Sequence, residues 1–226
     1  MHTRYTIALI ATIALLSPIT VSAQLLNGDF STGDFTGWTL FDTANGGIGN
    51  PAVVPFDTAG TGTLSNSAMF EVGQINGQIG GGIAQGGGIF QNVTLGSGIL
   101  NISLNAATQA VSDINADDGT FELILDGNVV DTWASGPNLD NANQIFRSTL
   151  SYSGEINAGV HEVEIEMVRG YGTESGDTPY QYIDNVTLEV IPEPSAYAWP
   201  GESSRRHEQS PGDTEQIPYF IGLPTK

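Results

Sequence analysis

The stretch Thr120–Trp133 reads TFELILDGNVVDTW and decides the fold class of this chain. In its first half Phe121, Leu123 and Leu125 occupy every second position, which is the period of a strand that buries one face. The dipeptide Asp126-Gly127 then supplies the residues that a two-residue hairpin turn favours. Because a second strand-like run follows this turn at once, the stretch predicts an antiparallel β-hairpin.

The same period continues on both sides of the hairpin. Val160–Val168 alternates three apolar residues with three glutamates, so the first set is predicted to face inward and the second outward. The two sets are Val163, Ile165 and Met167, and Glu162, Glu164 and Glu166. Other strand-like runs, separated by Gly- and Asn-rich turns, are Trp38–Asp42, Ala52–Phe56, Ala68–Val72, Ile89–Leu95, Leu100–Ala106, Ile145–Tyr152 and Tyr180–Val190. The sequence therefore predicts an all-β fold, a two-sheet antiparallel sandwich.

The amino-acid composition limits the kinds of partner that the protein is expected to bind. The chain has 25 Asp and Glu residues against 6 Lys and Arg, a formal net charge of −19. A field this negative repels nucleic acid and anionic lipid, so no nucleic-acid partner is expected, whereas neutral ligands and divalent cations are favoured. The chain has no cysteine. Its fold must therefore depend on packing, or on packing and a metal, rather than on disulfides.

The N-terminus predicts export. Arg4 precedes an apolar run, Tyr5–Leu16, that is too short to span a bilayer, and Val21-Ser22-Ala23 matches a small-residue cleavage site. Residues 1–23 are therefore predicted to be a signal peptide, followed by a single domain over residues 24–191. We expect the protein to be secreted, at the cell surface or extracellular.

Several motifs in residues 24–191 resemble one family. They are LLNGDF at Leu25–Phe30, GDFTGW at Gly33–Trp38, FELILDG at Phe121–Gly127, AGVHEV at Ala158–Val163 and YIDNVTL at Tyr182–Leu188. Together they resemble the jelly-roll carbohydrate-binding modules of families 4, 9 and 22, which implies a galactose-binding-like jelly-roll sandwich. The resemblance implies a non-catalytic domain that binds a polysaccharide or another glycan. A structural matrix protein without a discrete ligand site and a glycan-active enzyme are the alternatives.

The same resemblance implies a structural calcium ion between the first and last strands. Asp184 stands at the family's C-terminal ligand position, whereas Ser31 stands where the family usually has a glutamate. Asp29 is the candidate replacement, because calcium takes hard oxygen ligands from carboxylates and carbonyls. The alternative is that Asp184 caps a turn or hydrogen-bonds the opening strand.

The candidate ligand-binding residues are the aromatic residues Tyr171, Trp133 and Tyr180. Aromatic faces pack against the C–H faces of sugar rings. Tyr171 lies in the predicted loop Arg169–Thr173, where a ring has no core to fill, while Trp133 ends a hairpin strand and can equally belong to the core. Trp38 resembles the family's core tryptophan and is assigned to packing.

No catalytic site is expected. His161 is the only histidine in residues 24–191 and is predicted on the solvent-facing side of its strand, and no Gly-x-Ser-x-Gly motif is present. The acidic stretch Asp113–Gly119 has its glycine one position too late for an EF-hand, so a turn is expected there. The glycine-rich stretch Gly73–Gly88 lacks the lysine of a phosphate loop and is predicted to be a mobile surface loop.

The tail, residues 192–226, begins like a sorting signal. Ile191–Ala198 reads IPEPSAYA and resembles the start of the bacterial PEP-CTERM signal, which implies a membrane anchor and processing by an exosortase-type enzyme. Trp199–Lys226 is instead polar, so it is predicted to be disordered and not to span a membrane. One hypothesis is that Trp199 onward is read in a shifted frame, since suitable codons give an apolar run after Ala198 in another frame. Resequencing across the Trp199 codon tests this.

Overall fold

The computed structural model describes residues 25–76, 83–111, 117–136, 142–173 and 178–192. The predictions for the signal peptide, for the tail from Glu193 onward and for residues 113–116 lie outside these ranges. Every element in the described part is a strand or a turn. Accordingly, these ranges hold no helix that is long and apolar enough to cross a membrane.

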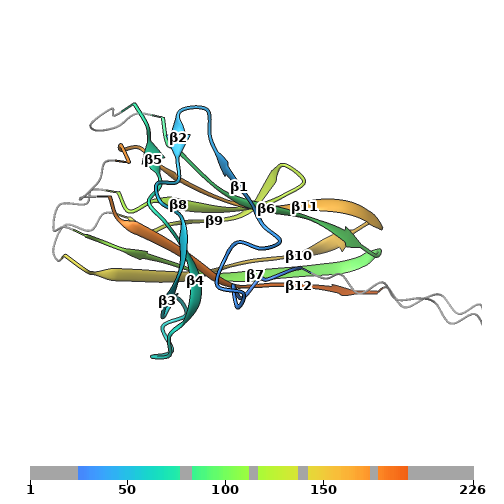
Figure 1. The fold of residues 1–226 in the computed structure, drawn as a ribbon. Coiled ribbons are helices and arrows are strands. Elements are labelled where there is room, and N and C mark those ends of the chain that lie inside the picture. The colour runs from blue at the N-terminus through green and yellow to red at the C-terminus, as the bar shows by residue number, and fades with distance from the viewer. Residues whose placement is uncertain (1–24, 77–82, 112–116, 137–141, 174–177, 193–226) are drawn as a thin grey trace, which may run out of the picture. The chain divides into compact units, whose positions relative to one another are not determined.

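Two five-stranded antiparallel sheets lie face to face and confirm the predicted all-β sandwich (Figure 1). The β11 sheet has the order β1 (Thr39–Asp42), β6 (Gln85–Leu95), β11 (Gly159–Arg169), β8 (Thr120–Leu125) and β9 (Asn128–Ala134). The β12 sheet has the order β10 (Ile145–Ile156), β7 (Gly98–Gln109), β12 (Tyr180–Ile191), β4 (Ser65–Phe70) and β3 (Ala52–Phe56). A small ribbon pairs β2 (Gly46–Gly47) with β5 (Gly73–Gln74).

The predicted hairpin is the β8–β9 pair. Asp126 and Gly127 have φ angles of 50° and 74°, the left-handed conformation that a tight hairpin turn of this kind requires. β8 also pairs with β11, with Phe121 opposite Met167 and Leu125 opposite Val163. The alternation of both strands therefore points its apolar residues to the same side.

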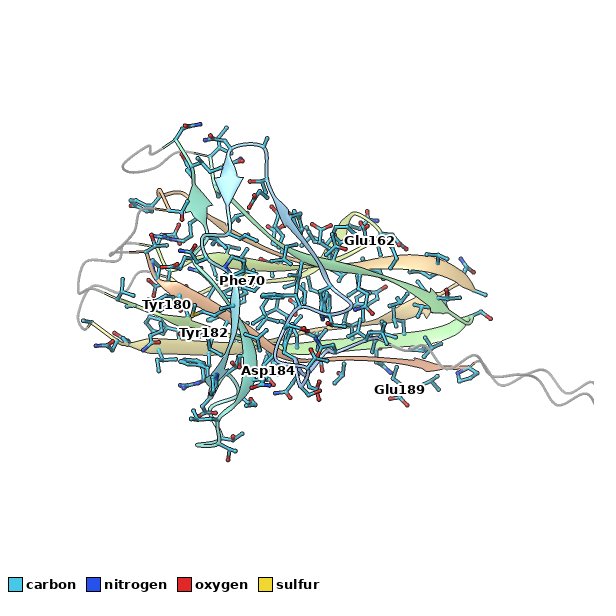
Figure 2. The ribbon with its side chains drawn as sticks, in the orientation of Figure 1. Phe70, Glu162, Tyr180, Tyr182, Asp184 and Glu189 are labelled. Atoms are coloured by element: carbon cyan, nitrogen blue, oxygen red, sulfur yellow. The ribbon has the colours of Figure 1, made fainter. Side chains whose placement is uncertain are left out.

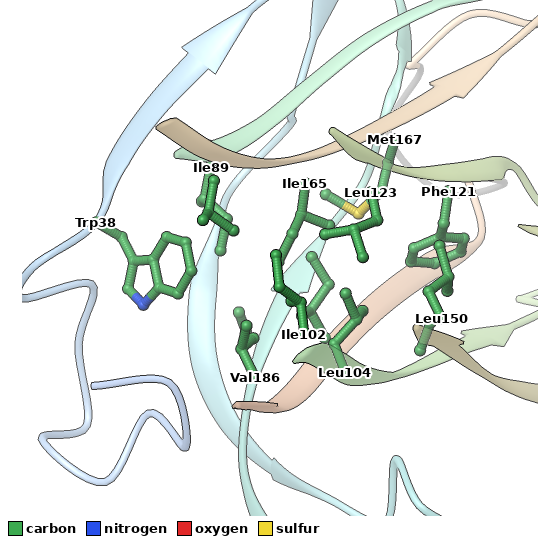
Figure 3. Close-up of a cluster of buried hydrophobic side chains, with 14 of the residues drawn as sticks. Trp38, Ile89, Ile102, Leu104, Phe121, Leu123, Leu150, Ile165, Met167 and Val186 are labelled. Carbon is green, nitrogen blue, oxygen red and sulfur yellow. The ribbon is translucent and has the colours of Figure 1, made fainter. Parts of the chain in front are cut away.

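The core fills the space between the sheets (Figure 3). Phe121, Leu123 and Ile165 of the β11 sheet meet side chains of the β12 sheet such as Leu104 and Leu150, all of them almost fully buried. Each such side chain contributes roughly 1.5–3 kcal/mol by leaving water, which replaces the stabilisation that disulfides would give.

The segment before β1 closes one side of this core. Trp38 is 6% exposed and stacks on Phe30 with ring centroids 6.1 Å apart, while its indole Nε1 donates to the Asn27 carbonyl at 3.0 Å. The packing role predicted for Trp38 is confirmed.

The prediction of a mobile surface loop over Gly73–Gly88 is wrong at both ends. Gly73 and Gln74 form the buried strand β5. Gly86–Gly88 lie within β6, paired on one side with β11 and on the other partly with β1. A Cβ added to Gly88 would lie 1.9 Å from the carbonyl oxygen of Ile165. The glycines are therefore needed for close strand contact rather than for mobility.

The prediction that His161 faces solvent is also wrong. His161 shares the inward alternation of Val163 on β11, and its side chain is 13% exposed. Its Nδ1 lies 2.7 Å from Asp126 Oδ2 and its Nε2 lies 2.9 Å from the Asn157 carbonyl oxygen. The hydrogen bond with Asp126 is the main cause that raises the pKa of His161.

Candidate functional site

A row of carboxylates lies on the outer face of the β11 sheet. Glu162, Glu164 and Glu166 of β11 point away from the core, as their alternation predicts (Figure 2 labels Glu162). On the neighbouring strand β8, Glu122 pairs directly with Glu166. Like charges directly opposite each other destabilise an antiparallel pair, so this arrangement is not explained by fold stability.

Two half-buried phenylalanines lie beside these glutamates. On β6, Phe90 pairs with Glu164, and on β1, Phe41 pairs with Gly88. The rings of Phe41 and Phe90 are 6.2 Å apart between centroids, tilted at 55°. Gly88 pairs with Phe41 on one side and with Glu166 on the other, so no side chain stands between that ring and that glutamate. We call these residues, Glu122, Glu162, Glu164, Glu166, Phe41, Gly88 and Phe90, the glutamate face.

The electrostatics of the glutamate face are unusual for a surface. Burial raises the pKa of Glu164, and the nearby carboxylates of Glu166, Glu162 and Glu122 raise it further. Burial likewise raises the pKa of Glu166, with Glu122 as the second cause. Within the part of the chain that the structure describes, the ion pairs are Arg147–Asp57 and His161–Asp126, so no basic side chain neutralises this face.

This combination suits a ligand with many hydroxyl groups. Carboxylate oxygens accept hydrogen bonds from hydroxyls, and the half-buried rings offer apolar faces for C–H groups. The sequence indicated the outward direction of three of the glutamates, but not Phe41, Phe90 or Glu122.

The three predicted aromatic residues do not form one surface. Trp133 of β9 stacks on Phe121, with centroids 5.2 Å apart, and packs against the core, which supports the packing alternative for it. Tyr180 starts β12, in the other sheet from Trp133, and its ring centroid lies 6.3 Å from that of Tyr182 (Figure 2). Tyr171 follows β11 and is half-buried, and its carbonyl accepts a hydrogen bond from the Gln74 amide at 2.8 Å.

The predicted metal ligands lie on the β12 side of the molecule. Asp184 is fully buried, and its carboxylate accepts hydrogen bonds from the Ser65 hydroxyl and from the Asn185 amide, the latter at 2.6 Å. Burial raises the pKa of Asp184 despite these bonds, and the nearby charge of Asp29 adds to the shift. The carboxylate of Asp29 accepts a hydrogen bond from the Ser31 amide at 3.1 Å, and its bonds with Ser31 lower its own pKa.

This neighbourhood fits a hard cation in its chemistry. Asp184, Asp29 and Ser65 offer carboxylate and hydroxyl oxygens, the donors that calcium prefers. The described residues contain no group of three or more His, Cys, Asp or Glu side chains that could hold a metal. A calcium ion here would therefore take its other ligands from hydroxyl and carbonyl oxygens. The hydrogen bonds of Asp184 to Ser65 and Asn185 equally match the alternative role in which it only braces its neighbours.

Comparison with known proteins finds similarity in structure only. No protein-family model matches the chain, and no curated protein matches its sequence. The fold is similar to TmCBM61, solved in complex with β-1,4-galactotriose, at 13% identity and a TM-score of 0.39 over 74% of this chain and 97% of that one. It is similar to a xylan-binding domain of family CBM 22 at 18% identity and a TM-score of 0.40, over 70% of this chain and 89% of that one.

A third similar structure belongs to a longer protein. The enzymatically active domain of tailspike protein 4 of bacteriophage CBA120 is 15% identical, with a TM-score of 0.41. The match covers 73% of this chain but only 21% of the tailspike chain.

Proposed function

We propose that this protein is an exported, non-catalytic glycan-binding protein and that the glutamate face is its binding surface. The observation that carries the proposal is the placement of Phe41 and Phe90 beside Gly88, directly across from Glu164 and Glu166. Rings for C–H faces and acceptors for hydroxyls are the two features that a sugar ring needs. The leader-like residues 1–23 support action outside the cell, at extracellular polysaccharide or the cell surface.

The negative charge of the glutamate face limits the class of glycan that it can bind. Four glutamates without a described basic neighbour repel uronic acids, sulfates and phosphates. The proposed ligand is therefore a neutral polysaccharide whose hydroxyls donate to Glu164 and Glu166.

A glycan array with the purified full-length chain, followed by calorimetric titration of each hit, tests this function. We expect saturable binding to one or more neutral polysaccharides. Phe90→Ala removes one ring contact, which costs about 1–1.5 kcal/mol, or roughly a tenfold loss of affinity. Tyr180→Ala is the matched control on the other sheet and leaves affinity unchanged.

Two results would contradict the proposal. If no glycan binds saturably, the structural matrix protein is the better description. If Tyr180→Ala or Tyr171→Ala abolishes binding while Phe90→Ala does not, the ligand binds elsewhere on the molecule.

A further inference from the structure

A short segment at one end of the sandwich connects both sheets. Asp117–Gly119 precedes β8, and the Asp117 carbonyl accepts a hydrogen bond from Arg169 Nε at 2.8 Å. The Asp118 carbonyl accepts one from Gln181 Nε2 at 2.8 Å. The Gly119 carbonyl accepts one from the Ser135 amide at 3.1 Å. The segment thereby contacts the ends of β9 and β11 in one sheet and β12 in the other.

Arg169 and Gln181 extend this connection to the end of β4. Arg169 Nη1 donates to the Val72 carbonyl at 3.2 Å, and the Val72 amide donates to Gln181 Oε1 at 2.9 Å. Arg169 is 4% exposed and Gln181 is fully buried. The ends of four strands thus depend on one buried polar network. We call Asp117–Gly119, Arg169 and Gln181 the end network.

One group in the end network is left without a hydrogen bond. Asp118 is fully buried, and neither of its carboxylate oxygens has a hydrogen-bond partner. The described charged groups near it are Arg169 of β11, which favours its ionised form, and Asp117 beside it, which opposes it. The other elements that the end network joins contribute neutral groups to it, namely Ser135 after β9, Gln181 of β12 and Val72 after β4. The hydrogen bonds described for the Arg169 guanidinium go to backbone carbonyls rather than to the Asp118 carboxylate.

A buried carboxylate of this kind is tolerated much better neutral than ionised. An ionised carboxylate without donors retains most of its desolvation cost, whereas the neutral acid does not. Burial accordingly raises the pKa of Asp118 to about 6, from an ordinary 3.8.

We propose that Asp118 acts as a proton-operated latch for this end of the sandwich. With a neutral Asp118 the segment Asp117–Gly119 stays inserted between the sheets and holds the ends of β9, β11 and β12 together. When Asp118 ionises, local opening of the segment allows the charge to reach water, so opening requires less free energy. Acidification thus closes this end of the sandwich, and neutral conditions loosen it.

The direction of the pH effect on the closed state follows from the difference between the folded and the unfolded pKa of Asp118. The folded pKa lies above the unfolded one, so the neutral side chain favours the closed state at low pH. This stability declines as the pH rises from about 4 to about 6 and stays low above that range.

Hydrogen exchange of the full-length chain tests the latch. The amides of Gly119, Ser135 and Gly170 report on it, because each donates within the end network. After correction for intrinsic exchange rates, we expect their protection to fall about tenfold between about pH 5 and about pH 7.5. Asp118→Asn, which cannot ionise, keeps high protection at both values. Glu189→Gln, a change of an exposed carboxylate on β12, keeps the wild-type pH dependence.

Unchanged wild-type protection between the two pH values would overturn the proposal, as would the same pH dependence in Asp118→Asn. If Asp118→Asn fails to fold, an NMR titration of the side-chain carboxyl carbons in the wild-type protein decides. The latch requires a midpoint for Asp118 near 6, and a midpoint at the ordinary 3.8 rules it out.

Discussion

The two outer faces of the sandwich use similar residues in opposite ways. On the β12 sheet, Tyr182 is 4% exposed and stacks on Phe56 of β3, with parallel rings 3.7 Å apart between centroids. On the β11 sheet, the partly buried rings of Phe41 and Phe90 lie beside glutamates and pair with each other. The ring pair of the β12 sheet thus contains a buried tyrosine, whereas both rings of the β11 sheet remain partly exposed.

The charged groups also differ between the two outer faces. Asp57 follows β3, yet its carbonyl accepts a hydrogen bond from Arg147 Nε at 2.9 Å, and its carboxylate lies 3.9 Å from Arg147 Nη2. Because β10 and β3 are the two edges of the β12 sheet, the connection after β3 crosses the outer face of this sheet. The glutamate face has no such covering contact among the described residues. The difference indicates which face is available to a ligand.

The largest effect is expected on the covered face, from calcium. Asp184 is buried there with a raised pKa and has no described basic partner, so we propose that a calcium ion compensates its charge. An ion at about a hundred times its dissociation constant adds roughly 2.7 kcal/mol of stability. Thermal unfolding should therefore shift down by several degrees in EDTA and recover when calcium is added.

Asp184→Asn provides the control, because its melting temperature should not respond to EDTA. An identical wild-type melt with and without EDTA would show that Asp184 only braces Ser65 and Asn185.

A matched pair of substitutions, one on each outer face, is expected to separate the effects on stability from those on glycan affinity. Phe56→Ala removes a partly buried ring stacked on Tyr182 and is expected to destabilise the fold by about 1.5–2.5 kcal/mol. Phe90→Ala removes a ring whose partner, Phe41, is itself only partly buried, so we expect a loss of less than about 1.5 kcal/mol. Chemical denaturation measures both. Only Phe90→Ala should lower glycan affinity at conditions where both variants are folded, and equal losses of affinity would remove the distinction between the faces.

The smallest effect expected is that of pH on the glutamate face. The folded pKa values of Glu164 and Glu166 lie above the ordinary 4.5, so ionisation costs stability and their contribution to folding improves as the pH falls toward 4.5. Glycan affinity should change in the opposite direction, because a protonated carboxyl is a poorer acceptor for hydroxyls. We expect a loss of about threefold to tenfold between about pH 7 and about pH 4.5, measured by calorimetry.

Glu164→Gln should flatten this profile while keeping the shape of the side chain. Affinity that rises on acidification, or a profile that Glu164→Gln leaves unchanged, would contradict the role of these carboxylates.

Local sequence patterns predicted much of the fold. The period of Val160–Val168 placed its glutamates outside and its apolar residues inside, and Asp126-Gly127 identified the hairpin turn. Such features depend on neighbours within a few residues, which the sequence displays directly.

The candidate site could not be predicted from local patterns, because it depends on the pairing of strands that are far apart in the sequence. Phe90 lies opposite Glu164 only because β6 pairs with β11, and Phe41 joins them through β1. Nothing in the local pattern fixes that register. The end network was missed for the same reason, since the stretch around Asp117 predicts only a turn, while its contact with Arg169 spans 52 residues.

Whether the glutamate face binds the glycan is tested by an NMR titration of the isotopically labelled full-length chain with the neutral oligosaccharide that the array selects. We expect the largest chemical-shift changes on the amides of Phe41, Gly88, Phe90 and Glu164. The amides of Tyr180, Tyr182 and Asp184 on the covered face should remain unchanged. Changes that centre on this second set, with the glutamate face unaffected, would contradict the assignment of the binding surface.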